Sequence, residues 1–65
     1  MDTNRILGRW KELKGKLREN YGELTEDELE KARGDRAHLE GILQHRLGKT
    51  KDEARKALDE VLEAV

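Results

Sequence analysis

Apolar residues in this 65-residue chain never stand more than two in a row, and near its start they recur every three or four positions. They are Ile6, Trp10, Leu13, Leu17 and Tyr21. This spacing places them on one side of an α-helix, whereas a half-buried strand would need strict alternation. Runs of two residues are also far too short for a membrane span or a signal-peptide core. The sequence therefore predicts a soluble, cytoplasmic protein built from amphipathic helices, with no contact with the membrane.

The predicted core is thin, because 45% of the residues are charged and 34% are hydrophobic. A chain of this length buries only about 60% of the surface that it exposes when unfolded. The 14 basic and 15 acidic residues nearly cancel, so the high net charge typical of disordered chains is missing. There is no cysteine for a disulfide or a thiolate zinc site. We expect one small domain over residues 1–65, with too little apolar surface for a metabolite pocket and hence no enzymatic activity.

Glycines and capping residues divide the chain into four predicted helices. The first runs from residue 3 or 4 to residue 20 and ends in a left-handed turn at a glycine. The second and the fourth each begin with a capping box, in which a Thr is followed three residues later by a Glu. The third lies between two glycines and begins near residue 35. The residues that mark these boundaries are Gly22, Thr25, Gly34, Gly48 and Thr50.

The chain also contains an internal repeat, because residues 13–32 match residues 39–57. The shared pattern is L-x-G-x-L, four residues, G, a short turn, T-x-D-E, two residues and K-A. Each copy encodes a helix, a turn and a capped second helix, so the predicted fold is all-α, a bundle of four helices arranged as two helical hairpins. Gly15 and Gly41 occupy equivalent helix-interior positions, where glycine costs about 1 kcal/mol. We expect a neighbouring helix to approach each of them closely; the alternative is that both are tolerated on the surface.

Several motifs resemble the CsbD-like family of small bacterial proteins associated with general stress responses. The resemblance lies in W-K-E-L-K-G-K at residues 10–16 and Y-G-E-L-T-E-D-E at residues 21–28, and it covers roughly residues 8–57. It continues through Gly34, Arg36, Leu39, Gly41, Gln44, Arg46, Gly48 and K-D-E-A at residues 51–54. The family usually has Trp where Tyr21 stands and an aromatic residue where Leu47 stands. Because the family has no established biochemical activity, the resemblance implies no catalytic, cofactor-binding or metal-binding residue.

A basic face of the first helix is the candidate nucleic-acid contact. Lys11, Lys14 and Arg18 fall on one side of it and could contact phosphates. A dedicated binder usually has a strongly basic domain and aromatic residues that stack on bases. This chain has a pI of about 6.1, and its Trp and Tyr lie on the apolar stripe. We therefore expect weak or no nucleic-acid binding and interpret these residues as a solvated face.

Neither the histidines nor the acids form a recognisable site for chemistry. His38 and His45 are two turns apart, about 10 Å along a helix, so they cannot share a metal ion. The acids Glu26–Glu28 are explained by helix capping, and pairs such as Glu12 and Lys16 stand at the favourable spacing of four residues. We predict no catalytic residue, no cofactor and no metal.

Structural roles are predicted for a set of residues on the apolar stripes and at the helix ends. Trp10 and Tyr21 could form a stacking platform, but as the largest apolar groups of a thin core they are better explained by packing. The end of the last helix either completes the core or contacts a partner, so the chain is a monomer or associates weakly with itself. The set is Trp10, Leu13, Gly15, Leu17, Tyr21, Gly22, Thr25, Leu39, Gly41, Gly48 and Thr50.

Together these observations predict a non-enzymatic bacterial stress-response protein with a small, highly charged helical domain. Its charged surface would contact other macromolecules weakly, and the sequence specifies no particular partner. Two alternatives remain at this level. One is a nucleic-acid-associated protein that uses the basic face of the first helix. The other is a hydrophilin-like protectant that is loosely folded in dilute solution and gains helix on crowding or drying.

Overall fold

The computed structural model describes residues 2–65, and all the regular structure in that range is helical. This confirms the predicted all-α class. The helix count differs from the prediction, because the structure has five helices in the described range and not four. They are α1 (Asp2–Gly8), α2 (Trp10–Asn20), α3 (Glu26–Lys31), α4 (Arg36–Leu47) and α5 (Lys51–Ala64).

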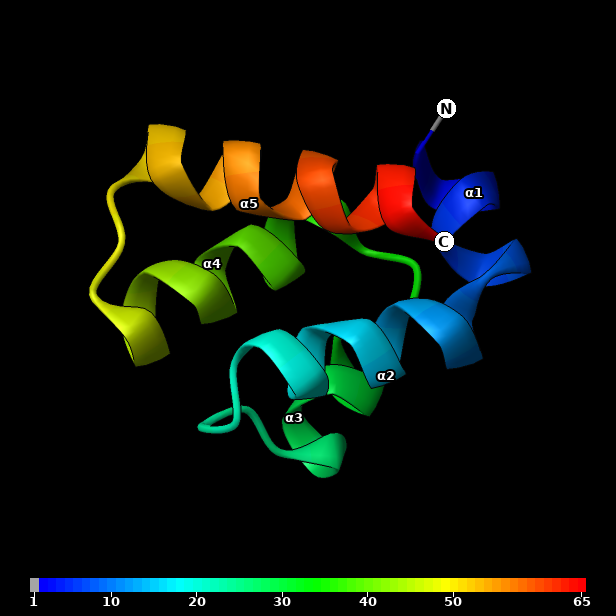
Figure 1. Cartoon of the computed structure of the whole chain (residues 1–65), viewed down its shortest axis with the longest axis horizontal. Coiled ribbons are helices and arrows are strands. Elements are labelled where there is room, and N and C mark those ends of the chain that lie inside the picture. Colours follow the sequence, from blue (N-terminus) through cyan, green and yellow to red (C-terminus); the bar gives the residue numbers. More distant parts are fainter. Residues whose placement is uncertain (1) are drawn as a thin grey trace.

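The helices pack into a compact body with extents of 28 × 22 × 20 Å. The most extensive contact joins α4 to α5, which follow one another in the chain (Figure 1). Helix α5 also packs against α2, and α2 packs against the short α3. Helix α1 contacts both α2 and α4, beside the C-terminal end of α5. Consecutive helices α2 and α3, and α4 and α5, are in contact, but with α1 as a fifth helix the arrangement is not the predicted four-helix bundle of two hairpins.

The additional helix arises because the first predicted helix bends at Arg9. This residue leaves the helical region, with φ −122° and ψ 26°. The backbone hydrogen bonds nevertheless continue across the bend, from Arg9 N to Arg5 O at 3.1 Å and from Leu13 N to Arg9 O at 2.8 Å. The bend brings Arg5 to the end of α5, where its Nη2 donates a hydrogen bond to the Leu62 carbonyl at 2.9 Å. That contact satisfies a carbonyl that the last turn of a helix leaves without a partner.

Side-chain caps start the helices where the sequence predicts them. Thr25 and Thr50 each form a complete capping box, with Glu28 and Glu53 respectively. Asp35 caps α4 by accepting a hydrogen bond from the His38 amide at 3.1 Å. Each such cap contributes about 1 kcal/mol to helix stability. These caps fix the starts of α3, α4 and α5.

The predicted helix ends are confirmed at one glycine and wrong at another. Gly48 ends α4 in the left-handed conformation, with φ 66°. Gly22 does not, because among the described residues only Gly34 and Gly48 have positive φ. Helix α2 ends at Asn20, as predicted, but its C-cap is Tyr21, where φ is −132° and ψ is 85°. A turn follows in which the Leu24 amide donates to the Tyr21 carbonyl at 3.0 Å, so no left-handed residue is needed.

One apolar cluster occupies the interior, and no polar or charged residue is buried among the described side chains. The predicted core residues Trp10, Leu13, Leu17 and Leu39 are all buried, and Tyr21 and Leu47 pack partly buried against the cluster. The buried residues are Ile6, Trp10, Leu13, Leu17, Leu24, Leu29, Ala32, Leu39, Ile42, Leu43, Ala54, Ala57, Leu58, Val61 and Leu62. Every helix therefore contributes to the same core.

The predicted close approach of a helix to Gly15 and Gly41 is wrong. A Cβ atom built on either glycine would meet nothing within 4 Å outside its own helix. Both residues are exposed to solvent, so the repeated L-x-G-x-L pattern places its glycine on the outer face of α2 and of α4. The alternative, glycines tolerated on the surface, is the correct interpretation.

Replacing Gly41 should stabilise the protein, because alanine restricts the unfolded chain and fits the helix. We expect Gly41→Ala to add about 0.5–1 kcal/mol to the free energy of unfolding. A thermal melt followed by circular dichroism should show a midpoint several degrees higher, since about 1 kcal/mol shifts such a small domain by roughly 4–8 °C.

The matched control is Gly34→Ala, which should be destabilising. Gly34 has φ 79°, and an added Cβ would lie 3.0 Å from Cδ2 of Leu7. A melting midpoint of Gly41→Ala at or below that of the wild type would contradict the assignment of Gly41 as an unconstrained surface residue.

Candidate functional site

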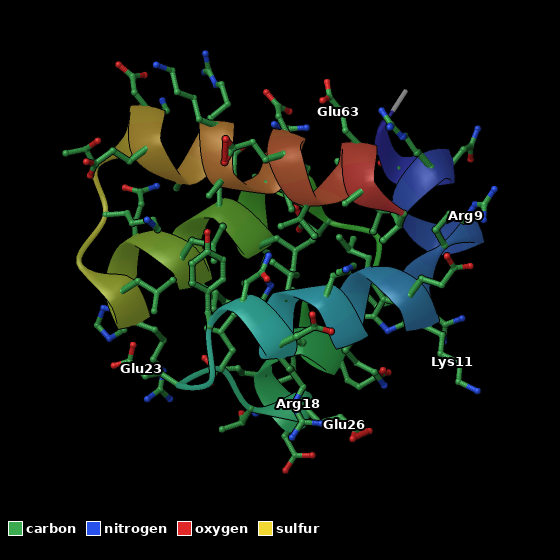
Figure 2. The ribbon with its side chains drawn as sticks, viewed as in Figure 1. Arg9, Lys11, Arg18, Glu23, Glu26 and Glu63 are labelled. Carbon is green, nitrogen blue, oxygen red and sulfur yellow. The ribbon has the colours of Figure 1, made fainter. Side chains whose placement is uncertain are left out.

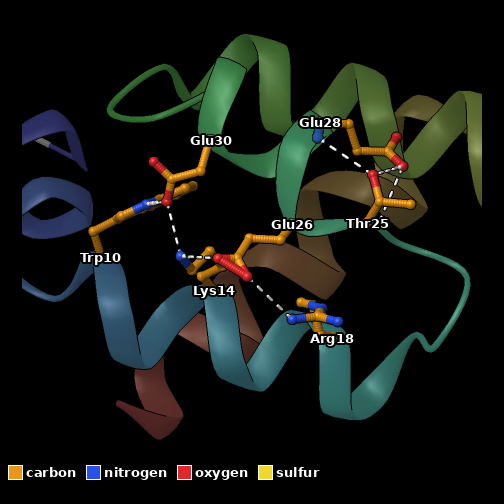
Figure 3. Close-up of polar contacts among 7 residues, drawn as sticks. All are labelled: Trp10, Lys14, Arg18, Thr25, Glu26, Glu28 and Glu30. Atoms are coloured by element: carbon orange, nitrogen blue, oxygen red, sulfur yellow. Dashed lines mark hydrogen bonds and ion pairs between the residues drawn. The ribbon is translucent and has the colours of Figure 1, made fainter.

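Two of the three basic candidates of the first helix are engaged by acids of α3. Lys14 Nζ lies 2.8 Å from Glu30 Oε1 and 3.3 Å from Glu26 Oε2. Arg18 Nη1 lies 3.6 Å from Glu26 Oε1 (Figure 3). Lys11 is exposed and makes no ion pair with any residue in the described range. The structure thus places the predicted nucleic-acid contacts in two different settings, with Lys14 and Arg18 turned toward acids and Lys11 in solvent.

The same carboxylate that binds Lys14 also holds the indole of Trp10. Trp10 Nε1 donates a hydrogen bond to Glu30 Oε1 at 2.8 Å, so two donors meet on one oxygen. We call Trp10, Lys14, Arg18, Glu26 and Glu30 the α2–α3 clasp. Its α2 members follow each other at intervals of four residues, and so do its two acids on α3, in the opposite order. The clasp gives the W-x-x-x-K part of the sequence motif a structural role.

Helix α3 is held on its other side by α4. Arg46 Nε lies 3.0 Å from Oε1 of Glu28. The second oxygen of Glu28 accepts hydrogen bonds from the Thr25 amide at 3.1 Å and from its hydroxyl at 3.0 Å. One carboxylate therefore closes the capping box of α3 and links that helix to α4.

These contacts favour the charged forms of the residues involved. The hydrogen bonds from Lys14 and then Trp10 hold the pKa of Glu30 below its ordinary value, and Glu30 in turn raises the pKa of Lys14. Partial burial acts to raise the pKa of Glu28, but hydrogen bonds from Thr25 and the charge of Arg46 outweigh it and lower the pKa. These shifts favour the ionised forms of Lys14, Glu28 and Glu30.

The clasp is suited to holding helices α2 and α3 together. The Lys14 side chain is 19% exposed and that of Glu30 is 41% exposed, so each ion pair is accessible to water and screened by it. The residues described include no group of three or more His, Cys, Asp or Glu side chains that could bind a metal ion. His38 and His45 are both exposed on α4.

The aromatic residues do not form a stacking platform. Trp10 is 6% exposed and belongs to the core. Tyr21 is partly buried against that core, and Lys49 Nζ lies 5.5 Å from the centre of its ring. Both rings therefore serve packing, as the sequence predicts for Trp10.

An open hollow of about 320 Å³ lies between α2 and the end of α5. The exposed Gly15 contributes to its lining, and most of the other lining residues are charged. Arg9 and Lys11 project outward near this end of the molecule, as does Glu63 of α5 (Figure 2). The hollow is lined by Lys11, Glu12, Gly15, Lys16, Glu19, Ala64 and Val65.

Across the described part of the chain, every helix is too short or too polar to cross a lipid bilayer.

Sequence reasoning missed the acids that complete the clasp. It assigned Glu26 to capping alone and did not single out Glu30; Arg46, which contacts α3 from the other side, was named only as part of the family pattern. The signal that could have found the clasp is the matching interval of four residues, in Trp10, Lys14 and Arg18 on one helix and in Glu26 and Glu30 on the next. Antiparallel helices with such intervals bring opposite charges face to face along the contact.

Pairing within the protein should leave little affinity for nucleic acid. We expect a dissociation constant for single-stranded DNA weaker than about 10⁻⁴ M at physiological salt, the upper end of ordinary non-specific binding. Fluorescence anisotropy of a labelled oligonucleotide at 50 mM and 200 mM salt measures it. Micromolar binding that weakens steeply with salt and is lost in Lys11→Gln would contradict this expectation.

Comparison with known proteins places these features in a family. The model of the CsbD-like family matches residues 4–56. A UPF0337 protein of Rhodopseudomonas palustris is 48% identical over 92% of this chain and 91% of its own length. A UPF0337 protein of Bordetella pertussis is 42% identical over the same shares, and the UPF0337 protein YjbJ of Escherichia coli is 41% identical over 91% of this chain and 86% of its own. No solved structure matches the chain significantly. The chain belongs to the CsbD-like family.

Proposed function

We propose that this chain is a non-enzymatic stress-response protein of the bacterial cytoplasm that acts through its charged exterior. The observation that carries this role is the division between interior and surface. In the described range no charged or polar residue is buried, and Leu7 is the one exposed large apolar residue. The described surface thus offers charges of both signs and, apart from Leu7, no exposed large apolar side chain to other molecules.

Such a surface favours weak and reversible contacts. The net charge is −1 although 45% of residues are charged, so long-range attraction to strongly charged partners is small. Contacts between exposed charges are individually worth about 0–1 kcal/mol and are screened by salt. A protein with such a surface is expected to contact many macromolecules weakly without binding one of them tightly.

The non-enzymatic part of this role is supported by where the charged side chains are engaged. The acids with altered pKa values, Glu28, Glu30 and Glu53, serve helix caps or ion pairs within the protein. Strongly perturbed groups at active sites instead lie in a cleft, where burial and a specific charged partner shift their pKa values. Membership of the CsbD-like family supports the stress context.

Survival of a deletion strain tests the proposed role. We expect the strain to lose viability under at least one of osmotic, acid, oxidative and desiccation stress, and the wild-type gene to restore it. Complementation with Leu7→Ala should also restore survival, whereas Leu58→Ala should not, because it removes a core side chain. Equal survival of the deletion strain and its parent under all four conditions would overturn the proposed role.

A further inference from the structure

Helix α3 is attached to the rest of the protein by charged contacts on two sides, in addition to the burial of Leu29 and of the flanking Leu24 and Ala32. Three acids at alternate positions each reach a partner: Glu26 and Glu30 contact α2, and Glu28 contacts α4. The helix has only six residues, of which Leu29 alone is buried. Ion pairs therefore hold it on both sides, with a single apolar anchor within the helix.

The α4–α5 pair is held together in a different way. Helix α4 buries Leu39, Ile42 and Leu43, and α5 buries five residues, from Ala54 to Leu62. An ion pair also joins the two helices, between Arg36 Nη2 and Asp59 Oδ1 at 2.6 Å. Loss of carboxylate charge should therefore weaken the attachment of α3 far more than the contact between α4 and α5.

We propose that α3 is an acid-released latch, which detaches from α2 and α4 when Glu26, Glu28 and Glu30 are protonated while α4 and α5 remain packed.

The groups of α2 that contact Glu26 and Glu30 are cations or hydrogen-bond donors. Glu30 faces Lys14 and the Trp10 indole of α2, with the charge of Arg33 close by. Glu26 faces Lys14 and Arg18 of the same helix. Protonation therefore removes attraction and relieves no repulsion with α2.

The contact with α4 follows the same rule. Glu28 faces Arg46 across the gap and Thr25 within its own capping box. Since the charge of Arg46 persists in acid, only the loss of the Glu28 charge can release this side. Acid therefore weakens the contacts of α3 with α2 and its contact with α4 alike.

The direction of the pH effect follows from the lowered pKa values of Glu28 and Glu30. A carboxyl whose pKa is lower in the folded state stabilises that state fully above its unfolded pKa. This contribution is lost as the pH falls through the folded pKa, so release begins below the ordinary glutamate value of 4.5. The released segment carries Leu24, Leu29 and Ala32, all buried at neutral pH, so acid would expose an apolar surface that is absent at neutral pH.

An acid titration followed by ¹H–¹⁵N NMR tests the latch directly. Trp10 is the only tryptophan, so its indole resonance reports the hydrogen bond to Glu30 without ambiguity. Between pH 7 and pH 3, the indole and α3 amide signals should leave their native positions at a higher pH than the α4 and α5 amides. Simultaneous loss of all signals, or native indole and α3 signals down to pH 3, would overturn the latch.

A neutral variant separates the latch from the general effects of acid. Glu26→Gln, Glu28→Gln and Glu30→Gln together should raise amide hydrogen exchange in α3 at pH 7 at least tenfold and leave exchange in α4 and α5 within twofold. The matched control replaces Glu23, Glu60 and Glu63 by Gln, which gives the same change in net charge at exposed acids. If the control accelerates exchange in α3 equally, net charge is responsible and the latch is refuted.

Discussion

Trp10→Ala should leave the protein unfolded at room temperature. The indole is 6% exposed, lies in the core, and binds Glu30 through Nε1. Truncation of a buried aromatic residue to alanine costs about 3–5 kcal/mol. A single core of this size rarely supplies more than about 3–5 kcal/mol in total. The loss therefore equals the whole stability that we expect for the domain.

Circular dichroism at 222 nm and a thermal melt measure the effect. The control is Trp10→Phe, which keeps an aromatic ring in the core and removes only the donor to Glu30. We expect this variant to retain native helicity with a lower melting midpoint. Native helicity and a cooperative melt in Trp10→Ala would show that the indole is not part of the stabilising core.

Leu58→Ala should have the next largest effect, a loss of about 2–5 kcal/mol in the free energy of unfolding. Leu58 is 0% exposed and lies midway along α5, the helix that contacts both α4 and α2. Because close-packed interiors relax only in part, the truncation leaves a cavity whose cost adds to the lost burial.

Leu7→Ala is the matched control, since it makes the same chemical change at a side chain that is 43% exposed. We expect it to cost about 1 kcal/mol or less, because much less apolar area leaves the core. Urea denaturation of the three proteins gives the two differences in stability. Equal losses for the two substitutions would contradict the assignment of Leu58 to the core.

Local sequence patterns predict the helices well where the determining residues are close in the chain. The capping boxes at Thr25 and Thr50 and the Asp35 cap depend on side chains three residues from the amides that they bind, so the sequence alone locates them. The apolar stripe of Trp10, Leu13 and Leu17 likewise reports which side of α2 faces inward.

Features that depend on contacts between residues far apart in the chain could not be predicted from local sequence patterns. The bend at Arg9 preserves the four-residue spacing of Ile6 and Trp10, so a straight helix and a bent one give the same stripe. Gly22 can adopt a left-handed conformation, but the turn at Tyr21 makes it unnecessary. The environment of Gly15 and Gly41 depends on how the helix pairs meet, which the repeat does not encode.

The ion pairs, too, could not be predicted from spacing in the sequence alone. Glu12 stands four residues before Lys16, yet in the structure it pairs with Arg9 at 3.3 Å, while Lys16 lies 3.9 Å from Glu19. Exposed pairs along one helix differ by only about 0.2–0.5 kcal/mol, so several alternatives compete. The contacts of the clasp join residues of two different helices. They can be identified only once the packing of α2 against α3 is known.

A thermal melt of the wild-type chain in dilute buffer, followed by circular dichroism, tests most directly whether it folds on its own around the core described above. We predict a strongly helical spectrum at neutral pH, as five packed helices require, and a single cooperative transition on heating. A disordered spectrum that becomes helical only on crowding or drying would contradict this account and favour the loosely folded protectant.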